Sequence, residues 1–200
     1  MTGHAALYQA AAHCLTYPDA EFAGRLPLLR AAAPELAPFL DHAGSLPVRE
    51  LAAHYVQVFD FKNRHCLYLS WWTDGDTRNR GMSLVRFKEV YRAHGLEFSG
   101  EELPDFLPAV LEFSAASGSD ELLTAHRPGL ELLRIALSEA DTPYVHVLDA
   151  VCATLPGPTP KDRAEARALA AAGPPREDVG MEGLAPYGHL GLLPVLTGDH

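Results

Sequence analysis

Apolar residues recur along this chain at the three- and four-residue spacing of an α-helix, and this spacing is what most limits its possible folds. The spacing is clearest in residues 46–61, where one helical face carries Val48, Leu51, Tyr55, Val58 and Phe59. Runs of alternating β-branched residues, which mark strands, do not occur, whereas Ala, Leu, Glu and Arg are abundant. The sequence therefore predicts an all-α fold.

The pattern predicts one compact helical domain of about eight or nine short helices within residues 1–173. Helices are expected at about 3–16, 19–32, 34–43, 46–61, 77–94, 104–116, 119–139, 142–155 and 160–172. Asp76 is the expected N-cap of the helix at 77–94, and Pro104 is expected in the first turn of 104–116. A break is expected at Pro128-Gly129. The apolar run 67–72 has no visible partner strand, so we expect it to be helical or irregular.

Composition changes after Gly173. Residues 174–200 contain four Pro and five Gly and carry a net charge of −3, which is typical of a flexible linker. We therefore expect a flexible tail at 174–200. One hypothesis is that, if the domain has a groove that binds a partner, the apolar run at 190–196 occupies this groove while no partner is present. A disordered end is the simpler alternative.

The whole chain is acidic, with 16 Lys and Arg against 26 Asp and Glu and a formal charge of −10. Such a surface repels nucleic acid and anionic lipid unless a local basic patch overrides it. No apolar run approaches the roughly 20 residues of a membrane span, and the start lacks the features of a signal peptide. The three cysteines lie far apart, as in a reduced cytosolic protein. We expect a cytoplasmic protein with no nucleic-acid partner and no stable membrane association.

Sequence motifs of common catalytic sites are missing. The chain has no GxGxxG, Walker or GxSxG string, and its ten histidines show no HExxH spacing. Asp74 and Asp76 could together hold Mg²⁺, but a lone DxD pair is a weak signal and the N-cap role already explains Asp76. We therefore expect no catalytic residue, no metal and no cofactor. The alternative is a Mg²⁺-dependent helical enzyme that uses these two aspartates.

Two features of the middle of the chain point to a partner. Residues 77–92 hold five Lys and Arg against Glu89 alone, which indicates either a solvated face paired with acidic neighbours or a contact surface. Eleven large aromatic residues lie between Tyr55 and Phe113. Most of them must fill a core, but several could line a groove for an apolar peptide helix.

Several strings between residues 50 and 117 carry a family resemblance. They are YVQVFDF at 55–61, LYL at 67–69, GDTRNRGM at 75–82, YR at 91–92 and ELPDFLPAVLE at 102–112. Together they resemble the NarJ-type nitrate reductase assembly chaperones, also called the nitrate reductase delta subunit. That family is similar to the wider TorD-like group of redox-enzyme maturation chaperones, which implies an all-helical, TorD-like fold.

The resemblance also implies a function. It implies a cytoplasmic chaperone that binds the N-terminal segment of the apo catalytic (alpha) subunit of respiratory nitrate reductase and is not part of the mature enzyme. It further implies that the complex stays open for iron–sulfur and molybdenum-cofactor insertion before membrane docking. A sibling chaperone for another molybdoenzyme is the alternative, and only the client separates the two. The wider group has His after its Pro-Asp pair, whereas this chain has Phe106, which puts in doubt the nucleotide-binding role suggested for that group.

A chaperone of this kind needs a groove rather than a catalytic triad. We expect the groove to be formed around Tyr55, Phe59, Tyr68, Trp71, Trp72, Phe106 and Leu107, with some of these side chains in the core instead. We expect Glu102 and Asp105 to supply negative charge at its rim, where a basic peptide end would meet them. Arg78 and Arg80 complete the predicted partner-binding residues.

Overall fold

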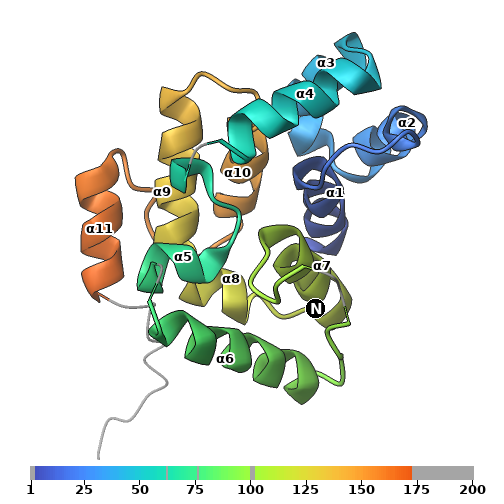
Figure 1. The fold of residues 1–200 in the computed structure, drawn as a ribbon. Coiled ribbons are helices and arrows are strands. Elements are labelled where there is room, and N and C mark those ends of the chain that lie inside the picture. Colours follow the sequence, from blue (N-terminus) through green and yellow to red (C-terminus); the bar gives the residue numbers. More distant parts are fainter. Residues whose placement is uncertain (1–2, 62, 76, 100–101, 173–200) are drawn as a thin grey trace, which may run out of the picture.

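The computed structural model describes residues 3–61, 63–75, 77–99 and 102–172, and these residues form helices and no strand (Figure 1). The α-helices are α1 (Ala5–Leu15), α2 (Phe22–Ala32), α3 (Ala37–Ser45), α4 (Val48–Phe59), α5 (Leu69–Asp74), α6 (Asn79–Ala93), α7 (Leu107–Ser117), α8 (Glu121–Ala125), α9 (Arg127–Glu139), α10 (Val145–Cys152) and α11 (Arg163–Ala172). Short 3₁₀ turns lie at Pro34–Leu36 and Asn63–His65. The predicted all-α fold is confirmed.

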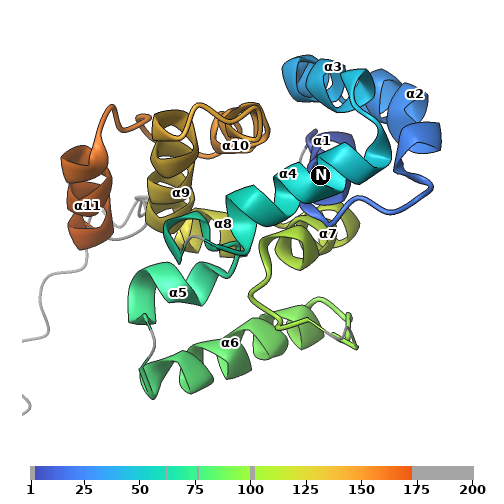
Figure 2. The same ribbon diagram turned by 45° about the horizontal axis from the view of Figure 1, so that its top comes forward.

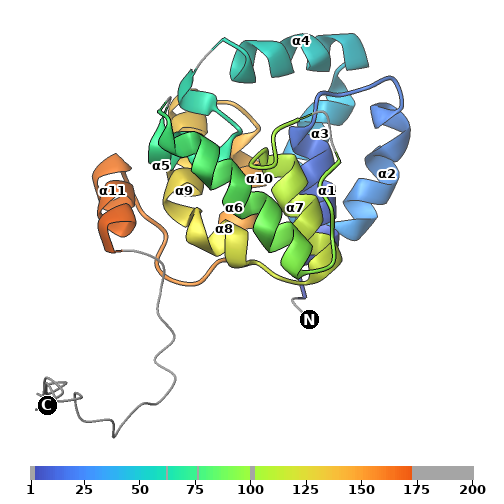
Figure 3. The same cartoon turned by 60° about the horizontal axis from the view of Figure 1, so that its bottom comes forward.

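The helices pack in two groups. α1 makes its most extensive contacts with α7 and also contacts α2, so it lies between them (Figure 3). α9 contacts α10 on one side and α11 on the other (Figure 1). α1 also packs on α10, which joins the two groups around one apolar core. α6 lies along an edge of the molecule, with α5 beside its first turns (Figure 2).

The apolar stripe of residues 46–61 becomes α4, and all of it is buried except Val48, which is half-buried. Leu51, Tyr55, Val58 and Phe59 are all buried. The rings of Tyr55 and Phe59 both contact the ring of buried Tyr144, with centroids 6.1 and 4.9 Å away. The Tyr55 hydroxyl donates to the carbonyl of Leu15 at 3.1 Å, which ties α4 to the end of α1.

Several helix boundaries differ from the prediction. α7 begins at Leu107 rather than at Pro104, so the first-turn proline is Pro108. α6 begins at Asn79, and its predicted cap Asp76 lies outside the described residues. The predicted helix at 119–139 breaks at His126, and Pro128 then sits in the first turn of α9, where its missing N–H costs nothing. Two predictions cannot be compared with the structure, because the tail 174–200 and its run 190–196 also lie outside the described residues.

A buried charge cluster fixes α9 to the loop that leads to α11. The carboxylate of fully buried Glu131 accepts from Arg134 Nε at 2.7 Å and from Arg127 Nη2 at 3.4 Å. Arg127 also donates to the carbonyls of Gly157 and Pro158, and Arg134 donates to the carbonyl of Pro160. The buried carboxylate is thus paired on both sides, as burial of a charge requires.

Gly129 is needed where α9 meets α5. A Cβ at Gly129 would lie 2.8 Å from Trp72 Cβ, whereas a Cβ at Gly24, within α2, would meet nothing within 4 Å. We expect Gly129→Ala to lower the free energy of unfolding by about 1–3 kcal/mol through overpacking. Gly24→Ala should raise it by roughly 0.5–1 kcal/mol through the gain in helix propensity. Urea unfolding followed by circular dichroism measures both, and a stabilised Gly129→Ala would contradict the packing.

His54 makes stability depend on pH. Burial, and then the nearby His42 ring, whose Nε2 lies 3.2 Å from His54 Nδ1, lower the pKa of His54 below its ordinary value. The unfolded chain then binds a proton more readily than the folded one, so this stabilisation is present above about pH 6.5 and is lost as pH falls through the lowered value. We expect the melting temperature to fall as the pH is lowered from about 7.5 to about 5, a range that spans the ordinary pKa of histidine. This fall should be less steep in His54→Gln than in the wild type. His13→Gln is the control, and a slope in His54→Gln as steep as in the wild type would contradict this role of His54.

Candidate functional site

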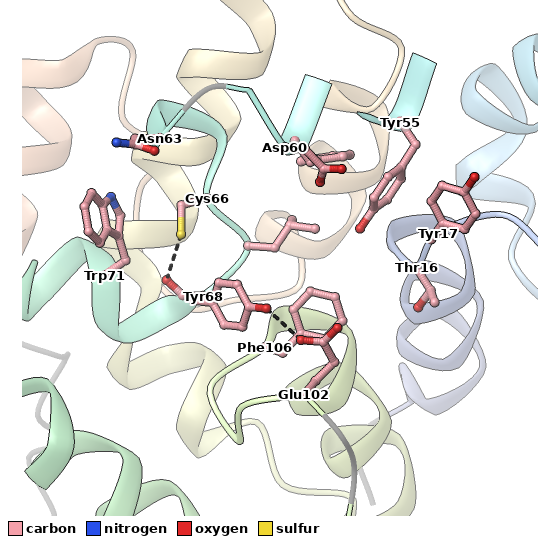
Figure 4. A pocket seen from close by; sticks show the side chains of 12 residues that line it. Thr16, Tyr17, Tyr55, Asp60, Asn63, Cys66, Tyr68, Trp71, Glu102 and Phe106 are labelled. Carbon is pink, nitrogen blue, oxygen red and sulfur yellow. Dashed lines mark hydrogen bonds between the residues drawn. The ribbon is translucent and has the colours of Figure 1, made fainter. Parts of the chain in front are cut away.

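A cavity of about 480 Å³ opens where four parts of the chain meet (Figure 4). These parts are the end of α1, the end of α4, the segment that leads into α5, and the turn before α7. We call it the aromatic cavity, and it is lined by Thr16, Tyr17, Tyr55, Phe59, Asp60, Asn63, Cys66, Leu67, Tyr68, Trp71, Glu102 and Phe106.

Two backbone hydrogen bonds bring the walls of the cavity together. The N–H of Leu69 donates to the carbonyl of Asp105 at 2.9 Å, and the N–H of Leu107 donates to the carbonyl of Leu67 at 2.8 Å. Tyr68 and Phe106 therefore face each other in an isolated antiparallel bridge, and their ring centroids are 5.4 Å apart. Two residues far apart in sequence form one aromatic wall in this way.

Asp105 secures the same junction from inside. Its side chain is 0% exposed, and Oδ2 accepts from the N–H of Ser70 at 3.1 Å and from the Ser70 hydroxyl at 2.5 Å. Arg80 Nη2 lies 3.9 Å from the same oxygen, and Arg80 Nε donates to Ser70 Oγ at 3.2 Å. The prediction that Asp105 lies at the rim is wrong, because this carboxylate is fully buried and its Oδ2 faces Ser70 and Arg80 inside the junction.

The mouth of the cavity is acidic. The exposed carboxylate of Glu102 accepts a hydrogen bond of 2.6 Å from the Tyr68 hydroxyl, and Asp60 lies on the opposite side, below α4 (Figure 4). Burial, followed by this hydrogen bond and the Glu102 charge, raises the pKa of Tyr68, while burial above all raises the pKa of Tyr55. Neither lysine nor arginine is among the lining residues that the structure describes. The site thus offers aromatic faces, neutral hydroxyls and two carboxylates.

Six of the eleven predicted site residues line this cavity, namely Tyr55, Phe59, Tyr68, Trp71, Glu102 and Phe106. Trp72 instead packs on α9, and its Nε1 donates to the carbonyl of Cys66 at 3.1 Å. Leu107 is fully buried in the core. The guanidinium of Arg80 lies 5.5 Å from the centroid of the Tyr68 ring and so supports the wall from outside. Arg78 is exposed at the start of α6, away from the lining.

Comparison with known proteins agrees with this architecture. Residues 26–150 match the model of the nitrate reductase delta subunit family. The chain belongs to this family. NarJ of Bacillus subtilis (strain 168) is 30% identical over 153 residues, which cover 70% of this chain and 83% of that protein. The nitrate reductase molybdenum cofactor assembly chaperone NarJ of Escherichia coli (strain K12) is 30% identical over 114 residues, or 56% of this chain and 48% of that one.

Two further matches place the domain among larger and more distant proteins. The nitrate reductase-like protein NarX of Mycobacterium tuberculosis (strain H37Rv) is 38% identical over 156 residues, which are 74% of this chain but 24% of NarX. The chain therefore spans about a quarter of that protein. A crystal structure of a candidate redox enzyme maturation protein from Archaeoglobus fulgidus superposes with a TM-score of 0.59 at 22% identity, covering 76% of this chain and 92% of that one. This match shows that the fold is shared.

Three of the five family strings, at 55–61, 67–69 and 102–112, supply residues that line the cavity, yet half of the lining was not predicted. Sequence reasoning missed Thr16, Tyr17, Asp60, Asn63, Cys66 and Leu67. Asp60 and Leu67 lie within the resemblance strings, which was the one available signal. Thr16 and Tyr17 come from the end of α1, and no local pattern relates them to residues forty positions away.

The Mg²⁺ alternative gains no support from the described residues. Asp74 Oδ2 accepts a hydrogen bond of 2.6 Å from the Ser83 hydroxyl, and Asp76 lies outside the described part. Within that part, no three His, Cys, Asp or Glu side chains are grouped closely enough to hold a metal ion. Among the same residues, no helix is long and apolar enough to cross a bilayer.

The two carboxylates of the turn before α7 should differ sharply in their effect on stability. We expect Asp105→Ala to lower the free energy of unfolding by about 2–3 kcal/mol, because the buried N–H and hydroxyl of Ser70 would lose their acceptor. Glu102→Ala, at an exposed position, should change it by at most about 0.5 kcal/mol. Urea unfolding of both variants tests this, and equal losses would show that Asp105 does not hold the junction.

Proposed function

We propose that this chain is a maturation chaperone for a respiratory nitrate reductase. It binds the N-terminal segment of the apo catalytic (alpha) subunit in the cytoplasm, and it keeps that subunit open for iron–sulfur and molybdenum-cofactor insertion before membrane docking. It then leaves and is not part of the mature enzyme. Membership of the delta-subunit family and the names of the NarJ relatives support this role.

The aromatic cavity is the observation that carries the proposal. Its rings supply apolar contact area for the hydrophobic face of a peptide helix, which is the recurring way in which grooves recognise such helices. Asp60 and Glu102 flank the rings and favour a peptide with a cationic end. An apolar segment with basic residues beside it therefore fits both parts of the site.

The chemistry of the cavity suits holding rather than reacting. Burial raises the pKa of the Cys66 thiol, which keeps it protonated and therefore a poor nucleophile at neutral pH. The Tyr55 and Tyr68 hydroxyls also stay protonated because burial raises the pKa of each. These groups can form hydrogen bonds to a peptide but are not activated for catalysis.

Binding of a synthetic peptide with the N-terminal sequence of the host's catalytic subunit tests the site directly. We expect Asp60→Asn combined with Glu102→Gln to weaken binding to the full chain about 3- to 10-fold at low salt, chiefly through slower association. Glu35→Gln combined with Glu50→Gln removes the same charge elsewhere and is the matched control. Calorimetry gives the dissociation constant, and stopped-flow mixing gives the association rate constant. Equal weakening in both pairs, or no binding to the wild type, would count against the cavity.

The identity of the client needs a separate experiment. A tagged full chain is recovered from its native host grown without oxygen on nitrate, and the captured proteins are identified by mass spectrometry. Recovery of the catalytic subunit of nitrate reductase, lost when its N-terminal segment is deleted, supports the proposal. Recovery of a different molybdoenzyme instead would assign the chain to a sibling system.

A further inference from the structure

The side of α6 that faces away from the core carries a regular stripe. At 100° per residue, positions 78, 82, 85, 89 and 92 fall on one face, opposite the buried Phe87 and Tyr91. This outer stripe of α6 consists of Arg78, Met82, Val85, Glu89 and Arg92, and all five are exposed. Met82 is 64% and Val85 is 48% exposed, although both are apolar. Figure 2 shows this helix along the lower edge of the molecule.

The charges around the stripe lack partners in the described part of the chain. Arg78 and Arg92 end the stripe, while Arg86 and Lys88 flank it on its two sides. None of these four cations forms an ion pair with a described residue, since every ion pair among the described residues involves a different cation. A positive, partly apolar surface thus stands on a chain whose net charge is −10.

The charge pattern selects the class of partner. Net negative charge repels nucleic acid and anionic membranes at long range, so they are disfavoured. A second copy is disfavoured as well, because antiparallel pairing of two α6 helices about Val85 would place Arg78 opposite Arg92, and parallel pairing would place each cation opposite itself. A short acidic polypeptide segment is repelled less by the net charge, because it carries far fewer charges than a nucleic acid or a membrane, and it places carboxylates rather than cations opposite the arginines.

We propose that the outer stripe of α6 is a docking site for an acidic amphipathic helix of a partner protein. The steps of four, three, four and three residues along the stripe match the seam along which two helices pack. Apolar residues of the partner cover Met82 and Val85, and its carboxylates reach Arg78, Arg86 and Arg92. Glu89 accepts a basic or amide side chain and so sets the register.

This site is distinct from the aromatic cavity. The cavity is supported by Arg80, which points to the inner side of α6, where it meets Tyr68 and Ser70. The outer stripe lies on the opposite side of the same helix. Docking on α6 and binding in the cavity can therefore be measured separately, and failure of one does not entail failure of the other.

The test uses the full chain and two synthetic helical peptides. One peptide has leucines at alternating three- and four-residue intervals flanked by glutamates, and the other has lysine in place of every glutamate. Fluorescence anisotropy measures the binding of each. The variant is Arg78→Glu, Arg86→Glu and Arg92→Glu combined. The matched control reverses three exposed arginines elsewhere, with Arg49→Glu, Arg64→Glu and Arg167→Glu combined. Circular dichroism tests whether both triple variants remain helical. If the α6 variant unfolds, it is replaced by a milder triple variant with Arg78→Gln, Arg86→Gln and Arg92→Gln.

We expect the acidic peptide alone to bind, and the α6 variant to weaken binding about tenfold or more while the control weakens it less than about threefold. Raising the salt from 0.05 to 0.5 M (on the order of a threefold shorter screening length) should weaken binding by the wild type. Equal weakening in both triple variants, or equal binding of the lysine peptide, overturns the proposal. The proposal is also overturned if the acidic peptide does not bind and the same three arginines instead mediate self-association or binding to vesicles with anionic lipid.

Discussion

The aromatic cavity and the helices beside it depend on the buried carboxylate of Asp105. It accepts two hydrogen bonds from Ser70 at the start of α5, while its own backbone carbonyl accepts from Leu69. The Tyr91 hydroxyl of α6 donates to the carbonyl of neighbouring Pro104. Three helices, α5, α6 and α7, are therefore positioned by one short turn. A buried acceptor that satisfies two donors defines such a junction more tightly than apolar packing alone.

The aromatic cavity follows from this junction rather than from any one helix. The bridge between Tyr68 and Phe106 sets one wall, and the cluster of Tyr55, Phe59 and Tyr144 fixes the other through the core. Both walls are thus held by contacts within the protein, and side chains that are already held in place lower the ordering cost of binding. Under the proposed function, the acidic mouth would select among apolar segments by charge.

Periodicity predicted the helices well and the site less well. The apolar stripe of α4 can be predicted from the sequence because its burial depends on spacing within one helix. The start of α7 was misplaced because Pro104 is equally compatible with a helix start and with the turn that Asp105 stabilises. Asp105 was assigned to the rim because its charge is visible in sequence, whereas its partner Ser70 is 35 residues away. Contacts across such separations leave no local pattern.

Tyr68 has a consequence for how the molecule would transmit a signal. Its ring faces Arg80 of α6, and its hydroxyl faces Glu102 at the mouth of the cavity. A ligand that displaces this side chain must alter contacts on both sides. A partner on α6 that alters the contact of Arg80 with Tyr68 would change the affinity of the cavity for its ligand. By thermodynamic linkage, the ligand in the cavity would change the affinity of α6 for that partner by the same factor. Tyr68 would in this way couple the binding and release of a segment in the cavity to the state of α6.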